Sequence, residues 1–449
     1  MIATAPGKLI LTGEYAVLDG APALVVAVNR RVVAARRQGP RGSSPFLAAV
    51  ADELAARGRR DAAEIAMTIA VDSKSFYDVP RAGLAPVKLG LGSSAAVTVA
   101  AVALALGETA RSASADRAGG PEALHGWLDR DLVLEIAAAA HARAQQTVVG
   151  APASRATRIS GQFAVPSAGS SLVEAAEPTF SPSGSDPGFD PNAEFSAEGT
   201  DPGSGHDPSA LPYGSGARSG DAGPIESIAV DLGTPRGRRR AHSITASPIQ
   251  GSGADIACAV HGGVLAYTVA ARAGSPTTAR RDLPRGVTLI PFFTGASADT
   301  RQLVAQVTAA RTARPAEVGA ALAAIAEASR AASQACDSSV RLTALAGDDR
   351  MSANAFLGAL TLAARAMDAL AAATGLPLVP PCVSAARAAL ARFGGTAKTT
   401  GAGGGDVAIA VVPASEDATL ATRCIIEAGG KPLALAIDQT GVDLRPDAA

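Results

Sequence analysis

The chain has 449 residues, of which 47% are hydrophobic and only 18% are charged. Its 40 Lys and Arg residues oppose 41 Asp and Glu residues, which gives a net charge of −1. This balance argues against a nucleic-acid-binding protein, which typically carries a basic excess or stripe. The apolar fraction is ample for a large core in two or three domains. Because aromatic residues make up only 3%, we expect that core to consist of small aliphatic side chains.

The start of the chain and its cysteines bear on the compartment in which the protein works. The first residues, Met-Ile-Ala-Thr-Ala-Pro-Gly-Lys, lack the basic start and apolar core of a signal peptide. The longest uncharged apolar stretch, residues 95–107, is shorter than the ~20 residues that a membrane span needs. The four cysteines are scattered without a CxxC pair, so neither structural zinc nor a disulfide framework is expected. We therefore expect a cytoplasmic protein.

In chain order, the patterns predict alternating strands and helices up to about residue 145 and again from about residue 250. Runs rich in Val, Ile and Leu favour strands at 8–12, 23–34, 67–71, 264–269, 287–293 and 407–412. Helical composition is found at 47–56, 95–106, 132–146, 297–311, 316–336, 352–374, 383–393 and 418–429. This alternation predicts an α+β protein built in two halves.

Residues 150–223 differ in composition from the rest of the chain. This segment is rich in Ser, Gly, Pro and Asp, repeats the dipeptide Asp-Pro, and shows no apolar periodicity. Such a sequence cannot bury enough apolar surface to offset the entropy lost on ordering. It predicts a disordered acidic insertion, followed by an isolated strand at 225–232.

The sharpest motif is Leu-Gly-Leu-Gly-Ser-Ser-Ala-Ala at residues 89–96, followed by a predicted helix. Its glycines let backbone N–H groups approach an anion closely, and the helix N-terminus adds the positive end of a dipole. At ~1.5–3 kcal/mol for each hydrogen bond to a charged group, three or four such bonds can hold a triphosphate. The segment matches neither the Walker A nor the GxGxxG pattern. The alternative is a turn that only caps the helix.

In three further motifs a charged residue lies beside glycines or at the start of a predicted strand. Lys-Thr-Thr-Gly-Ala-Gly-Gly-Gly-Asp at 398–406 predicts either a flexible turn or a backbone nest that closes over phosphates. Gln-Gly-Ser-Gly-Ala-Asp at 250–255 places Asp255 just inside a helix, either as a charge partner of the helix end or as a catalytic base. Lys8 enters a predicted buried strand, where it needs an anionic partner unless that strand end is exposed.

The order of these motifs resembles that of the GHMP kinase superfamily. Pro-Gly-Lys-Leu-Ile-Leu-Thr-Gly-Glu-Tyr at 6–15, Gly-Leu-Gly-Ser-Ser-Ala-Ala at 90–96 and Gly-Ala-Gly-Gly-Gly-Asp at 401–406 follow one another as in that superfamily. The closest similarity is to phosphomevalonate kinase, through segments 71–77, 140–145, 295–301 and 397–406. The resemblance covers residues 1 to about 145 and 250 to about 440 and leaves the insertion out.

The resemblance implies an α+β GHMP kinase fold. Residues 1–149 and 224–285 would form a βαβ-containing, ribosomal-S5-domain-2-like ATP-binding half, and residues 286–449 a ferredoxin-like half. It also implies an ATP- and Mg²⁺-dependent kinase that converts 5-phosphomevalonate to 5-diphosphomevalonate in the mevalonate pathway of isoprenoid biosynthesis. The site would lie in the cleft between the two halves.

The resemblance assigns roles by position. Asp255 and Lys8 would be catalytic, and Ser94 would help to hold Mg²⁺. The ATP phosphates would lie against Gly90, Leu91, Gly92, Ser93, Ser94, Ala95 and Ala96. The acceptor would contact Ser252, Gly253, Ser297, Thr300, Arg301, Lys398, Gly401, Ala402 and Gly403.

Two departures from the family pattern keep alternatives open. The insertion separates Gln145 from Gly251, and no clear second Mg²⁺ carboxylate is present, with Glu135 a weak substitute. We expect His141 and His261 to be structural. The alternatives are a mevalonate kinase and a non-catalytic small-molecule-binding protein. We expect no nucleic-acid or membrane partner, and a monomer or homodimer.

Overall fold

Two antiparallel sheets carry the sequence motifs, and the first is built around strand β1 (Ile2–Thr12). The computed structural model describes residues 1–37, 44–78, 86–115, 128–149, 251–269, 276–337 and 348–446, all within one compact unit. The predicted insertion at 150–223 and the predicted strand at 225–232 lie outside the described residues.

The first sheet has six strands in the order β12-β1-β2-β6-β7, with β3 paired to β2. β1 pairs along almost its whole length with β2 (Ala23–Arg36), with irregularities at Pro6/Gly7 and Ile10/Thr12. The remaining strands are β3 (Ile69–Asp72), β6 (Val264–Thr268), β7 (Thr277–Arg281) and β12 (Asp443–Arg445). The sheet therefore unites the beginning, middle and end of the chain.

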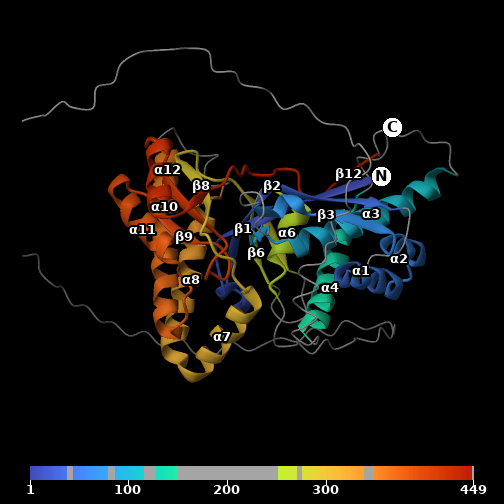
Figure 1. The fold of residues 1–449 in the computed structure, drawn as a ribbon, viewed down its shortest axis with the longest axis horizontal. Coiled ribbons are helices and arrows are strands. Elements are labelled where there is room, and N and C mark those ends of the chain that lie inside the picture. The colour runs from blue at the N-terminus through green and yellow to red at the C-terminus, as the bar shows by residue number, and fades with distance from the viewer. Residues whose placement is uncertain are drawn as a thin grey trace, which may run out of the picture. The chain divides into compact units, whose positions relative to one another are not determined.

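Helices α3 (Ser93–Ala115) and α6 (Ala254–His261) lie against β1 and β2 (Figure 1). Residues 95–105 of α3 are buried on every side, as expected for a helix that is apolar all round and lies in the core. α4 (Arg130–Val149) packs on α3, and α1 (Pro45–Ala56) and α2 (Arg60–Ala66) complete this layer. Short elements precede α3: η1 (Ala16–Asp19), η2 (Lys74–Phe76), β4 (Tyr77–Asp78) and β5 (Val87–Lys88).

The second sheet has four strands in the order β11-β8-β10-β9, and neighbouring strands in it are antiparallel. Its strands are β8 (Val287–Phe293), β9 (Thr396–Thr399), β10 (Val407–Pro413) and β11 (Lys431–Pro432). One side packs against α11 (Pro381–Leu390) and α12 (Ala418–Glu427). α10 (Asp348–Thr374) runs beside α8 (Pro315–Ala335) and contacts β9 (Figure 1). α7 (Thr300–Ala313) precedes α8, and η4 (Ala391–Phe393) follows α11.

The predicted elements are largely confirmed, with differences at their ends. β1 begins at Ile2 rather than at residue 8, because ladders to β2 and β12 extend it across Pro6 and Gly7. The short elements α2, β4, β5, β7, β9 and β12 were not predicted. Between α12 and β12 the chain forms the two-residue strand β11 and one bridge, between Ile437 and Val28.

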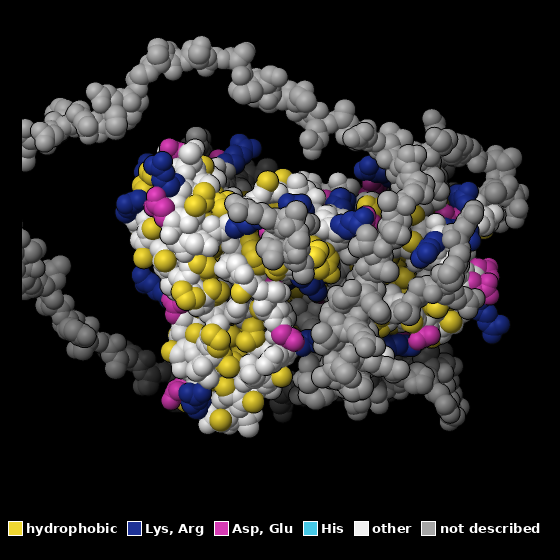
Figure 2. All heavy atoms as spheres, in the orientation of Figure 1, with side chains coloured by type: hydrophobic (Ala, Val, Ile, Leu, Met, Phe, Trp, Pro, Cys, Tyr) yellow, Lys and Arg dark blue, Asp and Glu magenta, His cyan; other side chains and the backbone are white. Residues whose placement is uncertain are grey.

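Among the described residues, two helices are long and apolar enough by composition to cross a membrane: residues 93–113 of α3 and 349–374 of α10. The protein buries 78% of the most apolar stretch of α3 and 50% of that of α10. α3 is therefore a core helix. α10 leaves Met351 and Leu362 exposed. On the face in Figure 2, hydrophobic side chains are scattered among uncharged atoms over the helices of the second half.

Candidate active site

The glycine loop at 89–94 is tied to the first sheet before it enters α3. The backbone N–H of Lys8 donates to the carbonyl of Leu91 at 2.9 Å, and that of Leu89 donates to Phe76 at 3.0 Å. Gly90 and Gly92 have φ values of +71° and +77°, which residues with a Cβ rarely adopt. A Cβ on Gly90 would also lie only 2.3 Å from Cγ of Asp406. The loop is therefore held where the C-terminal glycine motif meets it.

Lys8 projects from β1 between the two glycine loops. A Cβ on Gly92 would lie 3.1 Å from its Cγ, and one on Gly401 would lie 3.9 Å from its Nζ. Among the described residues no hydrogen bond or ion pair to this ammonium is found. The resemblance implies that Lys8 pairs either with Asp255 or with the transferring phosphoryl group, and the carboxylate of Asp255 does not lie within 4.0 Å of the ammonium. An unpaired ammonium beside two glycine loops is free to meet an anionic ligand.

Asp255 stands in the first turn of α6, two residues after the N-cap Gly253, which has a φ of +81°. Ser252 holds this turn: its carbonyl accepts from the hydroxyl of Tyr267 at 2.5 Å and its Oγ accepts from the N–H of Ala254 at 3.3 Å. Burial, and then the charge of Asp255, raise the pKa of Tyr267 to about 12. These contacts fix the half-buried Asp255 carboxylate on a short rigid element.

The charges of Lys8 and Asp255 act on the same neighbour. Burial raises the pKa of the Cys258 thiol; the charge of Lys8 opposes this rise, and the charge of Asp255 adds to it. Cys258 lies one turn beyond Asp255 on α6, so the two predicted catalytic residues lie near one another without forming an ion pair.

The hydroxyl of Ser94 meets a histidine that we expected to be structural. Nε2 of His141, on α4, lies 3.1 Å from Oγ of Ser94, and the imidazole stacks on Phe46 with ring centroids 5.5 Å apart. Burial lowers the pKa of His141, while the charge of Asp255 raises it and that of Arg301 lowers it. His141 therefore lies in the electrostatic field of the predicted site, whereas His261 lies at the end of α6 beside Arg130.

Asp406 joins the C-terminal glycine loop to the segment before α7. Its Oδ1 accepts hydrogen bonds from Oγ of Ser297 at 3.1 Å and from the N–H of Ala298 at 3.2 Å. Asp406 has a φ of +57°, one of two positive values among described non-glycine residues. Burial raises its pKa, and the hydrogen bonds and the charges of Lys8 and Lys88 oppose this rise. Ser297 thus contacts protein here, while Thr300 and Arg301 are exposed at the start of α7.

Lys88 is a residue that the motif analysis missed. Loss of hydration lowers the pKa of its amine although the residue is exposed; the charges of Asp406 and Asp299 oppose this shift, and those of Arg301 and Lys8 add to it. Charges from distant parts of the chain therefore act on Lys88. Its position two residues before Gly90 is the only sign of this in the sequence.

Lys398 does not face a ligand. Its ammonium donates to Oε1 of Glu14 and to the carbonyl of Thr399, and both side chains of the pair are at most 1% exposed. The expected contact of Lys398 with the acceptor's phosphate is therefore not supported, because its charge is already paired inside the protein. Burial raises the pKa of Glu14, and Lys398 opposes that rise most strongly.

Tyr15, the residue after Glu14, anchors the glycine loop at 401–406. The hydroxyl of Tyr15 donates to the carbonyl of Ala402 at 2.6 Å. Gly401 and Gly403 have φ values of +74° and +78°, and a Cβ on Gly403 would lie 2.3 Å from the carbonyl oxygen of Leu378. The motif at the end of β1 thus holds the loop that faces Lys8.

The described residues contain no group of three or more His, Cys, Asp or Glu arranged to hold a metal ion. Glu135 is unsuited as a second Mg²⁺ carboxylate, because it is 66% exposed and paired with Arg57 at 2.6 Å. Mg²⁺ usually keeps several waters and binds through substrate phosphates with few protein ligands. The Ser94 hydroxyl is compatible with that manner of binding.

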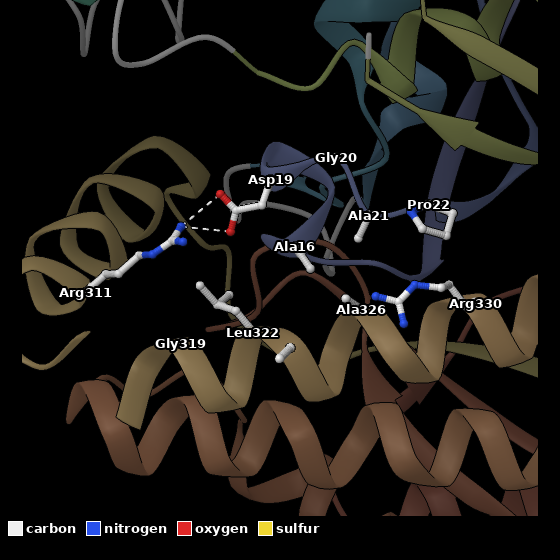
Figure 3. A pocket seen from close by; sticks show the side chains of 11 residues that line it. Ala16, Asp19, Gly20, Ala21, Pro22, Arg311, Gly319, Leu322, Ala326 and Arg330 are labelled. Carbon is white, nitrogen blue, oxygen red and sulfur yellow. Dashed lines mark hydrogen bonds and ion pairs between the residues drawn. The ribbon is translucent and has the colours of Figure 1, made fainter. Parts of the chain in front are cut away.

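A cavity of about 340 Å³ lies away from these motifs, between η1 and α8 (Figure 3). Arg311 of α7 closes one side through an ion pair with Asp19 at 2.8 Å, and Arg330 lies on the other. Neither the glycine loops nor Asp255 contribute a residue to the lining of this cavity. The cavity is therefore separate from the chemistry assigned above.

Comparisons with known proteins identify the fold. No protein-family model matches the chain, and no curated protein does either. Among solved structures, the Lin0012 protein of Listeria innocua superposes with a TM-score of 0.57 at 17% identity, over 99% of each chain. Streptococcus pneumoniae phosphomevalonate kinase, in complex with phosphomevalonate and AMPPNP, gives 0.55 at 14% identity, over 98% of this chain and 100% of that one. The protein has the α+β GHMP kinase fold, as predicted.

Proposed function

We propose that the protein is an ATP-dependent kinase that phosphorylates a small acceptor already carrying a phosphate. The specific activity that we propose is that of a phosphomevalonate kinase. The observation that carries this proposal is the position of the Lys8 side chain between the glycine loops at 89–94 and 401–406, where a Cβ on Gly92 or on Gly401 would meet it. Lys88 and Arg301 add positive charge near Asp406 and Asp299. None of the three has an ion-pair partner among the described residues. Cations left unpaired beside a helix N-terminus suit ligands that bring several negative charges.

The glycine loop is assigned to the ATP phosphates. Gly90 and Gly92 bring the backbone close to the ligand, and Ser93 and Ser94 open α3 with their N–H groups at its positive end. Mg²⁺, when bound with ATP, supplies charge neutralisation on the phosphate oxygens, and Ser94 is the residue assigned to it. The protein's own part is to fix the nucleotide with backbone donors that need no rearrangement during the reaction.

Lys8 and Asp255 are assigned to the transfer itself. The bond between the γ-phosphorus and the bridging oxygen of ATP breaks, and a new bond forms to an oxygen of the acceptor, which leaves ADP. Lys8 balances charge on the transferring group, which is where most catalysis of phosphoryl transfer arises. Any proton on the acceptor oxygen passes to the carboxylate of Asp255.

The acceptor class follows from the number of cations. A hydroxyl acceptor needs a base and little additional positive charge, whereas an acceptor phosphate adds close to two negative charges at neutral pH. Lys88 and Arg301, beyond the single Lys8, favour the second kind. The fold neighbour from Streptococcus pneumoniae was crystallised with phosphomevalonate, which supports this choice of acceptor.

Release of ADP, measured with mevalonate and with phosphomevalonate side by side, tests the proposal. We expect a strong preference for phosphomevalonate, because a site whose cations have no protein partner discriminates against a ligand that leaves them unpaired. A preference for mevalonate would make the protein a mevalonate kinase. Binding of ATP, shown by a thermal shift, without turnover of either acceptor would indicate a non-catalytic binding protein.

A further inference from the structure

The imidazole of His141 contacts three other side chains. Its ring lies on Phe46 of α1 at an interplanar angle of 25°, its Nε2 faces Ser94, and Nε2 of Gln145, one turn later on α4, lies 3.4 Å from both ring nitrogens. The side chain is only 5% exposed. An imidazole held in this way cannot turn without breaking the stack or a polar contact.

The amide of Gln145 holds the ring in place. Its Nε2 lies 3.4 Å from both Nδ1 and Nε2 of His141, so it does not select one tautomer of the neutral ring. In either tautomer Nε2 of His141 forms the hydrogen bond with Oγ of Ser94, as donor or as acceptor, and the hydroxyl keeps a lone pair for a ligand.

We propose that His141 is a positioning residue, whose Nε2 is hydrogen-bonded to Oγ of Ser94 and fixes the direction in which the Ser94 hydroxyl meets the nucleotide phosphates. This inference rests on the proposed function for the identity of the ligand only. The hydroxyl of Ser94 has no other side-chain partner among the described residues, so without His141 it rotates freely. Pre-orienting it removes that freedom before the ligand arrives.

The first test needs no ligand. Two-bond ¹H–¹⁵N spectra of protein labelled with ¹⁵N-histidine report on both ring nitrogens, and the His141→Gln variant identifies the signal of residue 141. We expect Ser94→Ala to shift the Nε2 signal of His141. An unchanged Nε2 signal would overturn the proposal, because it would show that the two side chains are not hydrogen-bonded.

The second test separates positioning from folding. His141→Phe keeps a ring against Phe46 but has no nitrogen, while His141→Gln keeps an amide donor close to the place of Nε2. We expect the first to raise the Kd for ATP with Mg²⁺ roughly two- to tenfold, which is the range of one neutral hydrogen bond, and the second to restore most of the affinity. Combined with Ser94→Ala, His141→Phe is expected to cause no further loss, because it acts through that hydroxyl.

Independent, additive losses in the double variant would overturn the proposal, as would equal losses in His141→Phe and His141→Gln. A His141 signal that responds to Ser94→Ala, in a wild-type protein that binds no ATP, would refute the proposed function and support the contact between His141 and Ser94. The two failures are therefore distinguishable.

Discussion

The ammonium of Lys398 donates a hydrogen bond to the carboxylate of Glu14, and this buried pair joins the end of β1 to strand β9. Tyr15, the next residue, binds the carbonyl of Ala402 in the loop that follows β9. Two adjacent residues of the first motif therefore hold the third motif in place. The pair serves the site by joining these segments and not by contact with a ligand.

Removal of either member of this pair should destabilise the protein strongly. Lys398→Met and Glu14→Gln are each expected to lower the free energy of unfolding by about 3–5 kcal/mol, because each leaves a buried group without its partner. The double variant should lose much less than the sum of the two. Urea unfolding of all four proteins measures this, and additive losses would show that the two side chains do not interact.

Gly90→Ala is expected to abolish ATP binding. The added Cβ would meet Cγ of Asp406 at 2.3 Å, and the backbone would be held at a φ of +71° that alanine avoids. Gly319→Ala is the matched control: this glycine lies inside α8 with no atom within 4 Å of an added Cβ. It should raise the free energy of unfolding by about 0.5–1 kcal/mol. Calorimetric titration with ATP and Mg²⁺ would compare the two, and normal binding by Gly90→Ala would contradict the loop assignment.

The loss caused by Asp255→Asn should depend on pH. An acceptor phosphate has its second pKa near 6, so a base is needed mainly below that pH. We expect kcat to fall by roughly 10²-fold or more near pH 6 and by less at pH 8, with ATP binding near normal. Lys8→Met should be severe at both pH values, because charge on the transferring group is needed throughout. A loss in Asp255→Asn that does not vary with pH would argue against a phosphate acceptor.

Asp406 should make stability depend on pH in a direction opposite to that of Asp417. Burial raises the pKa of Asp406 above its ordinary 3.8, so the folded protein retains a proton that the unfolded chain has lost. The free energy of unfolding contributed by this group falls as pH rises from 3.8 through the raised pKa. Asp406→Asn should remove that fall. Hydrogen bonds from Thr419 hold the pKa of Asp417 below 3.8, so its contribution is lost as pH falls. Urea unfolding between pH 3 and 7 would test both signs.

The motifs could be predicted from the sequence because glycine spacing and charge are local properties. Gly90, Gly92 and Gly253 all adopt the positive φ values that such motifs require. The function of Lys398 could not be predicted, since its partner Glu14 lies at the other end of the chain. For the same reason Lys88 was not singled out, and His141 was expected to be structural. Lys88 on β5 and His141 on α4 reach the site only when β5, α4 and α7 pack around α3 in the folded protein.

Replacement of residues 151–223 by a short Gly-Ser linker should leave both the melting temperature and kcat/KM unchanged. The segment has no apolar pattern, and lengthening a loop costs only ~0.6 kcal/mol per doubling. A normal melting temperature with a large kinetic loss would instead assign this segment a part in catalysis. Failure to fold would contradict the interpretation of its composition.

A Cβ on Gly251 would lie 3.5 Å from Oε1 of Gln145, so the chain leaves α4 and returns to α6 at nearly the same place. In the chain, β1 and β2 of the first sheet precede residues 150–250, whereas β6, β7 and β12 follow them. A cut between 150 and 250 would therefore create two fragments that each carry an incomplete sheet. Expressed separately, they should recover activity only by assembling with each other, so the protein could serve as a split reporter of proximity.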